Sequence, residues 1–333
     1  MDAFIKAIAY CLPERIVTNE ELVELFPEWT VDKIAGKVGV KSRHIAADGE
    51  TAGDLAVKAA ETLFSENEDI KREDIDFIIL CTQSPDYFLP STACIIQDRL
   101  GIPRKCGAFD IDLGCSGYEY GLAVAKGLIL AGISKNVLLL TSETYNKHIH
   151  PKDKGNRTIF GDGASATLIS IDGFARIGEF SLGTDGRGAE SLIHKTGAWR
   201  SHNLADDTIY DESGNPKSSD YLYMDGKAIF DFTAEAVPVM VSDVLEKNHC
   251  SLEEMGLIVF HQANKYMINY LRKLIGIDKE KFYCDIETVG NTVSSTIPIA
   301  LVEARKAGKL VGKVLLAGFG VGFSFGATII EVI

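Results

Sequence analysis

The chain has 333 residues, 46% of them hydrophobic and 24% charged, which allows a large buried core and excludes global disorder. The formal net charge of −13 excludes a general nucleic-acid-binding protein, because such a protein needs the opposite sign. The length suits two domains or one large α/β unit.

Short apolar runs alternate with helical patterns along the chain. In chain order we predict a helix over residues 52–65, strands over 76–81 and 108–112, a helix over 116–131, strands over 137–141 and 166–171, a helix over 225–248, a strand over 257–260, a helix over 266–275, a strand over 282–285, a helix over 297–308, and strands over 314–317 and 328–332. Several strands are continuous apolar runs, as is typical of strands buried on both faces. This alternation predicts α/β layers.

The second half of the sequence echoes the first. Three pairs of strand-like segments match, namely 76–81 with 257–261, 109–112 with 284–287, and 137–140 with 314–317. The offset is 176 residues from Gly132 to Gly308 and 177 from Val137 to Val314. Chance similarity among β-rich runs is the alternative to a duplication. The steady offset favours two similar α/β halves around a pseudo-two-fold axis, and we expect them at residues 1–173 and 174–333.

The N-terminal segment and the seven cysteines bear on location. Residues 1–10 lack the basic start and the long apolar stretch of a signal peptide, and no apolar run approaches the roughly 18 residues that span a bilayer. The cysteines form no C-x-x-C pair and no Cys/His cluster with zinc spacing. An odd number of cysteines without a disulfide framework is typical of a reducing compartment, so we expect a cytoplasmic protein.

The stretch 198–220 is polar and rich in turn-forming residues, which predicts an exposed insertion loop. Its Asp206, Asp207 and Asp211 could bind calcium, but they lack the ligand spacing of a calcium loop.

Cys115 is the first candidate for chemistry. It lies between a strand-like run and a helical run, and Gly114 and Gly117 permit a sharp turn there. The turn would put the sulfur at the positive end of a helix, which stabilises a thiolate and lowers the thiol pKa. A thiolate is a good nucleophile and leaving group for acyl transfer. A packed core cysteine is the alternative.

His261 and Asn291 are the second and third candidates. His261 follows the apolar run 257–260, at a strand end that is well placed for a site. Asn291 lies between a strand and a helix, 176 residues after Cys115, and is therefore its counterpart in the repeat. Matching turns of two halves would face each other across the pseudo-axis. A satisfied core histidine and a capping or turn asparagine are the alternatives.

Two glycine-rich stretches invite a nucleotide-binding interpretation. The stretch 318–323 is followed by a β-like run, whereas a dinucleotide loop must lead into a helix. It is better explained as a tight turn that brings backbone N–H groups near a thioester oxygen. The stretch 160–164 lacks the lysine and spacing of a P-loop and predicts a packed turn before a strand.

Together these segments resemble β-ketoacyl-acyl-carrier-protein synthase III, a condensing enzyme of the thiolase superfamily. The resemblance covers nearly the whole chain and is carried by residues 10–14, 39–45, 90–94, the Cys115 turn, 160–164, His261-Gln-Ala-Asn264, Gly290-Asn-Thr292 and 319–323. It implies the duplicated thiolase-like α/β/α/β/α fold and a homodimer.

The resemblance also implies a reaction. Cys115 would take an acyl group from acyl-CoA, with its own N–H and that of Val321 forming an oxyanion hole. Malonyl-acyl-carrier protein would then lose CO₂ while His261 and Asn291 donate hydrogen bonds to its thioester oxygen. The carbanion would attack the acyl-Cys115 thioester and release a 3-oxoacyl product, in fatty-acid or related lipid biosynthesis. No metal and no bound cofactor would be needed.

Coenzyme A contacts follow from the same resemblance, with departures. Trp29 resembles the tryptophan that stacks on adenine in the family, although about four extra residues separate it from Gly39. Lys154 replaces an arginine and cannot reproduce its planar contact, for which Arg157 is a possible substitute. Asn264 completes the predicted CoA set.

Other positions bear on the primer and the carrier. Leu89 stands where some relatives have a phenylalanine that limits acyl length, and Val321 adds a side chain within a family glycine triplet. These changes suggest a primer other than acetyl. Lys265, Arg272 and Lys273 are predicted to bind the acidic carrier protein, with a solvated helix face as the alternative.

Two other functions stay open at this point. A plain acyltransferase using Cys115 would become acylated without malonyl-dependent release of CO₂. A non-catalytic subunit that binds an acyl carrier would not need the Cys, His and Asn set. A redox enzyme is disfavoured because the glycine-rich strand–turn–helix fingerprint is missing from the sequence.

Overall fold

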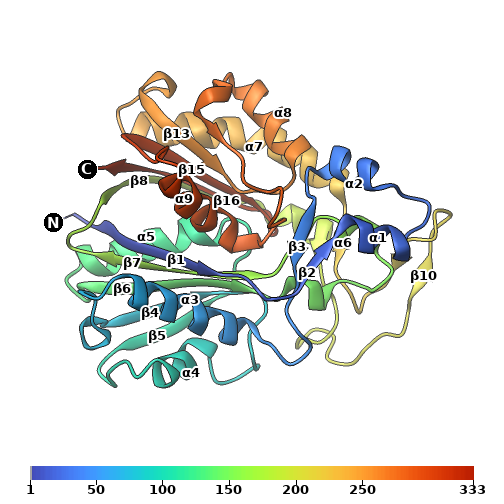
Figure 1. The fold of residues 1–333 in the computed structure, drawn as a ribbon, viewed down its shortest axis with the longest axis horizontal. Helices are drawn as coiled ribbons and strands as arrows, with labels where there is room; N and C mark the ends of the chain where they lie inside the picture. The colour runs from blue at the N-terminus through green and yellow to red at the C-terminus, as the bar shows by residue number, and fades with distance from the viewer. Residues whose placement is uncertain (1) are drawn as a thin grey trace.

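The computed structural model describes residues 2–333, so Met1, with which the predicted N-terminal half begins, lies outside the described residues. Within that range ten strands form the main sheet, in the order β14-β13-β15-β16-β8-β1-β7-β6-β4-β5 (Figure 1). The strands are β1 (Phe4–Cys11), β4 (Phe77–Cys81), β5 (Gly107–Ile111), β6 (Asn136–Glu143), β7 (Gly163–Ser170), β8 (Ala175–Thr184), β13 (Met255–Phe260), β14 (Phe282–Tyr283), β15 (Lys313–Gly320) and β16 (Ser324–Val332).

Short elements and helices complete the fold. Two-stranded sheets pair β2 (Ile16–Thr18) with β3 (Ser42–His44), β9 (Leu192–Ile193) with β12 (Tyr223–Met224), and β10 (Ile209–Tyr210) with β11 (Pro216–Lys217). The α-helices are α1 (Asn19–Leu25), α2 (Val31–Val38), α3 (Ala52–Glu66), α4 (Thr92–Arg99), α5 (Gly117–Leu130), α6 (Lys154–Arg157), α7 (Gly226–Lys247), α8 (Lys265–Ile275) and α9 (Thr296–Lys306). The 3₁₀ turns are η1 (Arg72–Asp74), η2 (Tyr145–His148), η3 (Gly186–Ser191), η4 (Leu252–Glu254), η5 (Lys279–Lys281) and η6 (Val293–Ser295).

The strand order is symmetrical about its centre. β5, β4, β6, β7 and β1 follow one another from one edge, and β14, β13, β15, β16 and β8 take the equivalent places from the other. In each half the first three strands are parallel and the last two run antiparallel to their neighbours. The halves join where β1 pairs with β8 at Phe4–Arg176 and Ile5–Ala175. The boundary predicted at residues 173/174 falls in the connection between β7 and β8.

Helices separate and cover the two half-sheets. α3 and α4 pack on the outer side of the first half, α7 and α8 cover the second, and α5 and α9 lie between them (Figure 1). Side chains of both halves meet in this central layer, where Leu139 and Leu316 share one buried apolar cluster with Leu122 of α5 and Leu301 of α9. These layers confirm the predicted thiolase-like α/β/α/β/α fold.

Some elements escape prediction for physical reasons. β8 alternates between buried and exposed residues instead of forming a continuous apolar run. The helices α1 and α2 have seven and eight residues and begin at the capping side chains of Thr18 and Thr30. β7 and β16 begin earlier than predicted, at Gly163 and Ser324, because small residues there are buried by neighbouring strands.

The predicted insertion loop, residues 198–220, is largely exposed and contains the β10–β11 hairpin. The carboxylates proposed for calcium instead close turns of the loop. Asp207 accepts a hydrogen bond from the Ser219 N–H at 2.8 Å, and Asp211 accepts one from the Asn215 N–H at 2.9 Å.

Within residues 2–333, every helix is too short or too polar to cross a membrane.

Candidate active site

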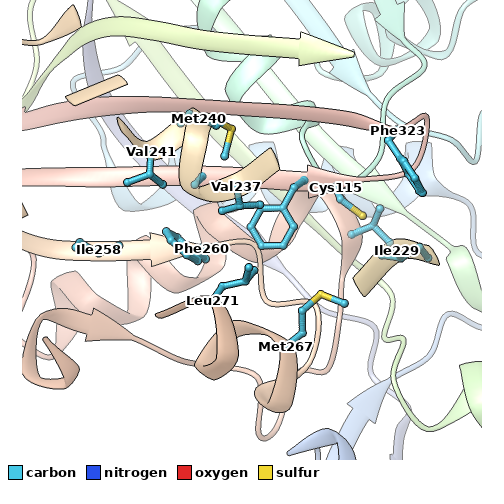
Figure 2. Packing of buried hydrophobic residues seen from close by; sticks show 14 of the residues in the cluster. Cys115, Ile229, Val237, Met240, Val241, Ile258, Phe260, Met267, Leu271 and Phe323 are labelled. Atoms are coloured by element: carbon cyan, nitrogen blue, oxygen red, sulfur yellow. The ribbon is translucent and has the colours of Figure 1, made fainter. Parts of the chain in front are cut away.

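Cys115 lies in a tight turn between β5 and α5. The Gly117 N–H donates to the Gly114 carbonyl at 2.8 Å, which closes the turn just before the helix. The neighbouring chain leaves little room, because a Cβ atom added at Gly320 would lie 2.6 Å from the Cys115 sulfur. The thiol is 8% exposed and belongs to an apolar cluster in which Ile229, Met267 and Phe323 lie nearby (Figure 2).

The predicted lowering of the Cys115 pKa is wrong. Burial raises the pKa of the thiol to about 12, and the Glu143 and Glu119 carboxyls raise it further, while hydrogen bonds from the backbone N–H groups of Val321 and of Cys115 itself lower it. The helix begins inside the core rather than at the surface, so the loss of water outweighs the favourable N–H groups. The thiol of the free protein is therefore protonated at neutral pH.

His261 lies immediately after β13 and points into the same region. The backbone N–H of His261 donates to the Ala317 carbonyl of the neighbouring strand β15 at 2.8 Å. The ring Nδ1 lies 2.7 Å from the Thr296 hydroxyl oxygen. The residue is 1% exposed, and burial lowers the pKa of the imidazole to about 3, so the ring is neutral at physiological pH.

Asn291 is held by the backbone on both sides. Its N–H donates to the Ile159 carbonyl at 2.9 Å, and its carbonyl accepts the Gly161 N–H at 3.0 Å. The side-chain Oδ1 accepts the Val293 N–H at 2.8 Å, and the side-chain amide contacts the Ala263 carbonyl at 3.4 Å. Because Oδ1 is occupied, the amide group is left as a hydrogen-bond donor.

The structure brings these three residues together on one cavity of about 270 Å³. Its other walls are mainly apolar and include Phe160, Leu192, Ile229, Met267 and Phe319. A wider groove of about 570 Å³ between α2, α7 and α8 shares Lys37, Val38, Asn264 and Met267 with this cavity and connects it to the surface.

Val321 lies beside Cys115. Its backbone N–H lies close enough to the Cys115 sulfur to lower the pKa of the thiol. Its added side chain packs against Gly114, since a Cβ atom there would lie 2.8 Å from Val321 Cγ1. An N–H in this position can also reach the oxygen of an acyl group bound to the sulfur, as an oxyanion hole requires.

The four predicted CoA residues separate into two pairs. Trp29 and Asn264 line the cavity. Lys154 is 9% exposed, and its ammonium group contacts Glu28 at 2.5 Å and the Ser213 carbonyl at 2.6 Å. Arg157 is half-buried and, like Lys154, is missing from the described walls of both the cavity and the groove.

Two lysines that were not predicted from the sequence lie beside Trp29. Lys33 and Lys37 of α2 place their ammonium groups 5.0 and 5.1 Å from the Trp29 ring centre. Both are exposed, and Lys37 lines the cavity and the groove. Their spacing of four residues on a helix that follows Trp29 is the signal that could have identified them.

The remaining predicted residues lie further out. Lys265 and Lys273 are exposed on α8, whereas Arg272 is half-buried and donates to the Ile277 carbonyl at 2.9 Å, which completes the end of the helix. Leu89 is 77% exposed and lies next to Phe88, which is 66% exposed. Leu89 is not among the described residues that line the cavity of its own chain.

Several known proteins are similar to this chain in sequence and in structure. Residues 109–186 match the family model 3-oxoacyl-[acyl-carrier-protein (ACP)] synthase III, and residues 245–332 match the model of its C-terminal part. The chain is similar to the beta-ketoacyl-[acyl-carrier-protein] synthase III of Clostridium perfringens, with 36% identity over 96% of both chains. It is also similar to that of Fusobacterium nucleatum, with 33% identity over 98% of both chains.

Two solved structures extend this similarity. A crystal structure of a 3-oxoacyl-(acyl-carrier-protein) synthase III is 46% identical, covers 99% of this chain and 100% of its own, and superposes with a TM-score of 0.97. A 3-oxoacyl-(acyl-carrier protein) synthase from Burkholderia xenovorans is 34% identical, with coverage of 100% and 94% and a TM-score of 0.90.

Proposed function

The chain belongs to the 3-oxoacyl-acyl-carrier-protein synthase III family of condensing enzymes, and on this premise we propose that it joins an acyl group carried on Cys115 to malonyl-acyl-carrier protein with loss of CO₂. The product is a 3-oxoacyl-acyl-carrier protein for fatty-acid or related lipid biosynthesis. The observation that carries the proposal is the shared cavity of Cys115, His261 and Asn291.

Acylation is the first proposed step. The Cys115 sulfur attacks the carbonyl carbon of an acyl-CoA, and the C–S bond to CoA breaks. The proton lost by the thiol is balanced by the proton that the departing CoA thiolate gains. The N–H groups of Cys115 and Val321 stabilise the negative oxygen of the tetrahedral intermediate, and this role is supported by their closeness to the sulfur, where they lower the pKa of the thiol.

Condensation is the second proposed step. When the malonyl group loses CO₂, the electron pair of the broken C–C bond moves toward the thioester oxygen. Neutral His261 and the amide of Asn291 donate hydrogen bonds to that oxygen, where the charge grows. The carbanion then attacks the acyl-Cys115 carbonyl, and the Cys115 thiolate leaves and takes up a proton from solvent, which regenerates the thiol. Neither step is a redox reaction, so the proposed chemistry requires no electron-carrying cofactor.

The substrates enter, in this proposal, through the groove between α2, α7 and α8. Trp29 and Asn264 contact CoA, and Lys33 and Lys37 supply the cations for its phosphates, in place of the engaged Lys154 and the half-buried Arg157. The exposed Lys265 and Lys273 remain candidates for contact with the acidic carrier protein. Support comes from Lys37 and Asn264, which line both the groove and the cavity, from Trp29, which lines the cavity, and from the ammonium groups of Lys33 and Lys37 beside the Trp29 ring.

Assembly and location belong to the proposal as well. We expect a homodimer, because β5 is an edge strand and Tyr87, Phe88 and Leu89 expose apolar side chains near it. We expect the cytoplasm, because all seven cysteines are free.

Intact-protein mass spectrometry tests the acylation step. The protein is incubated with a panel of acyl-CoAs, beside a Cys115→Ala variant. An acyl-sized gain that is lost in the variant is expected, and it ranks the primers. Malonyl-acyl-carrier protein is then added, and CO₂ and the 3-oxoacyl product are measured. Acylation without malonyl-dependent CO₂ would instead identify a plain acyltransferase, and no acylation from CoA or carrier thioesters would identify a binding subunit.

A further inference from the structure

A buried chain of hydrogen bonds lies behind the two proposed donors. The Thr296 hydroxyl oxygen is 2.7 Å from His261 Nδ1 and 3.0 Å from the Val293 carbonyl oxygen. The N–H of the same Val293 donates to Asn291 Oδ1 at 2.8 Å. His261 is 1% and Thr296 4% exposed. The segment from Val293 to Thr296 therefore contacts the side chains of both proposed donors.

The single hydroxyl proton of Thr296 determines which of its two contacts is a hydrogen bond that it donates. The Thr296 hydroxyl has one proton, so only one of its two short contacts can be a bond that it donates. The Val293 carbonyl already accepts the Thr296 backbone N–H and does not need the hydroxyl. His261 Nδ1, by contrast, meets no other donor among residues 2–333. Donation from the hydroxyl to Nδ1 follows the shorter of the two contacts, 2.7 Å against 3.0 Å, and leaves the Val293 carbonyl with the Thr296 N–H.

We propose that Thr296 is a positioning residue that keeps the proton of His261 on Nε2, by donating its hydroxyl proton to Nδ1. The ring then presents an N–H to the cavity, where the condensation needs a donor for the thioester oxygen. This inference rests on the proposed function, because the required tautomer follows from that reaction. The opposite tautomer would present a lone pair to the oxygen and would repel the charge as it grows.

The burial of His261 makes the tautomer matter. A protonated imidazole would have N–H groups at both nitrogens and would need no such control. Burial lowers the pKa of His261 to about 3, so the ring keeps a single proton during the reaction. The Val293 backbone has a φ of 56°, which is uncommon for a β-branched residue. Its N–H contacts Asn291 Oδ1, and its carbonyl contacts the Thr296 hydroxyl.

Three variants separate this role from a purely structural one. Thr296→Val keeps the shape and removes the hydroxyl, and Thr296→Ser keeps the hydroxyl. Thr292→Val is the matched control, since the Thr292 hydroxyl is buried in the same segment and has no hydrogen-bond partner among the described residues. We expect Thr296→Val to lower kcat for malonyl-dependent condensation by about 10²- to 10³-fold, as for the loss of one donor to a developing oxyanion.

The same variants should spare the other steps. The KM for malonyl-acyl-carrier protein and the rate of Cys115 acylation should stay close to those of the wild type in Thr296→Val, because backbone N–H groups serve acylation. Thr296→Ser and Thr292→Val should condense at nearly the wild-type rate. A Thr296→Val protein that condenses normally, or that loses acylation together with condensation, contradicts the assigned role.

Nitrogen-15 NMR gives a direct measurement that does not depend on activity. The chain has seven histidines, so the His261 signals are assigned by their loss in His261→Gln. The wild-type protein should carry its proton on Nε2, and Thr296→Val should move it to Nδ1. A proton on Nδ1 in the wild type overturns the inference. A wild type that shows the expected tautomer but releases no CO₂ from malonyl-acyl-carrier protein would refute the proposed function instead.

Discussion

Two buried glutamates show how hydrogen-bond partners affect the free-energy cost of burying a carboxyl group. Glu119, one turn after Cys115 in α5, is fully buried, and neither of its carboxyl oxygens has a hydrogen-bond partner among the described residues. Glu143 is equally buried, but its carboxyl accepts the Gln83 N–H at 2.8 Å and the Ser84 hydroxyl at 2.8 Å. Burial raises the pKa of both groups, to about 8 for Glu143 and well above 4.5 for Glu119.

Glu119→Gln should raise the free energy of unfolding at pH 7 and have little effect near pH 4.5. The folded chain keeps Glu119 protonated while the unfolded chain ionises it, so the wild type loses stability as pH rises above 4.5. The loss amounts to at most about 1.4 kcal/mol per pH unit while the pH stays below the folded-state pKa. Urea unfolding of the wild type and of Glu119→Gln at pH 5 and pH 7 measures this difference in the free energy of unfolding. A variant with the same pH dependence as the wild type would show that Glu119 is charged in the fold.

At the site, the sequence allows the identity of reacting residues to be predicted but not their surroundings. Cys115, His261 and Asn291 stand in recognisable segments, and the structure brings them onto one cavity. The thiol pKa could not be predicted, because burial depends on which distant strands cover the turn. Thr296 has no sequence signal, since its contact with His261 joins residues 35 positions apart.

Single elements decide how the cavity meets the surface. α2 begins at the capping side chain of Thr30 and ends at Gly39, whose φ of 79° suits a left-handed helix end. The Lys265 side chain lies where a Cβ at Gly39 would be, so α2 and α8 approach closely beside the groove. Short helices of this kind lack the long periodic pattern that made α5, α7 and α9 predictable from the sequence.

Lys33→Glu together with Lys37→Glu should raise KM for acyl-CoA by about tenfold or more with little change in kcat, because two cations near the proposed phosphate path become anions. Lys105→Glu with Lys135→Glu is the matched control. Both lysines are exposed and precede the strands β5 and β6, at the end of the sheet opposite Cys115. The two double substitutions change the net charge by the same amount. Initial rates at varied acyl-CoA concentration and two salt concentrations test this. Equal KM values in the two double variants would remove α2 from the CoA site.

The whole molecule repeats one topology, and this is the feature that the sequence predicts best. Continuous apolar strands such as β4, β6, β13 and β15 stand out, and their steady offset indicates the two halves that we propose at residues 1–173 and 174–333. The pairing of the central strands β1 and β8 is harder to predict, because it joins residues of the two halves that are far apart in the sequence. The unpaired edge of β5 can be recognised only once the strand order is known.

The exposed apolar side chains near β5 lead to the prediction for assembly. A stable dimer covers about 800 Å² on each partner, and an exposed group of large apolar side chains is typical of such an interface. Phe88→Asp with Leu89→Asp should shift the sedimentation coefficient from dimer to monomer at micromolar concentration, because burying two carboxylates in an interface is costly. Val239→Asp, on the outer helix α7 and 68% exposed, is the control and should remain dimeric. If the double variant sediments like the wild type, the second copy does not bind at this surface.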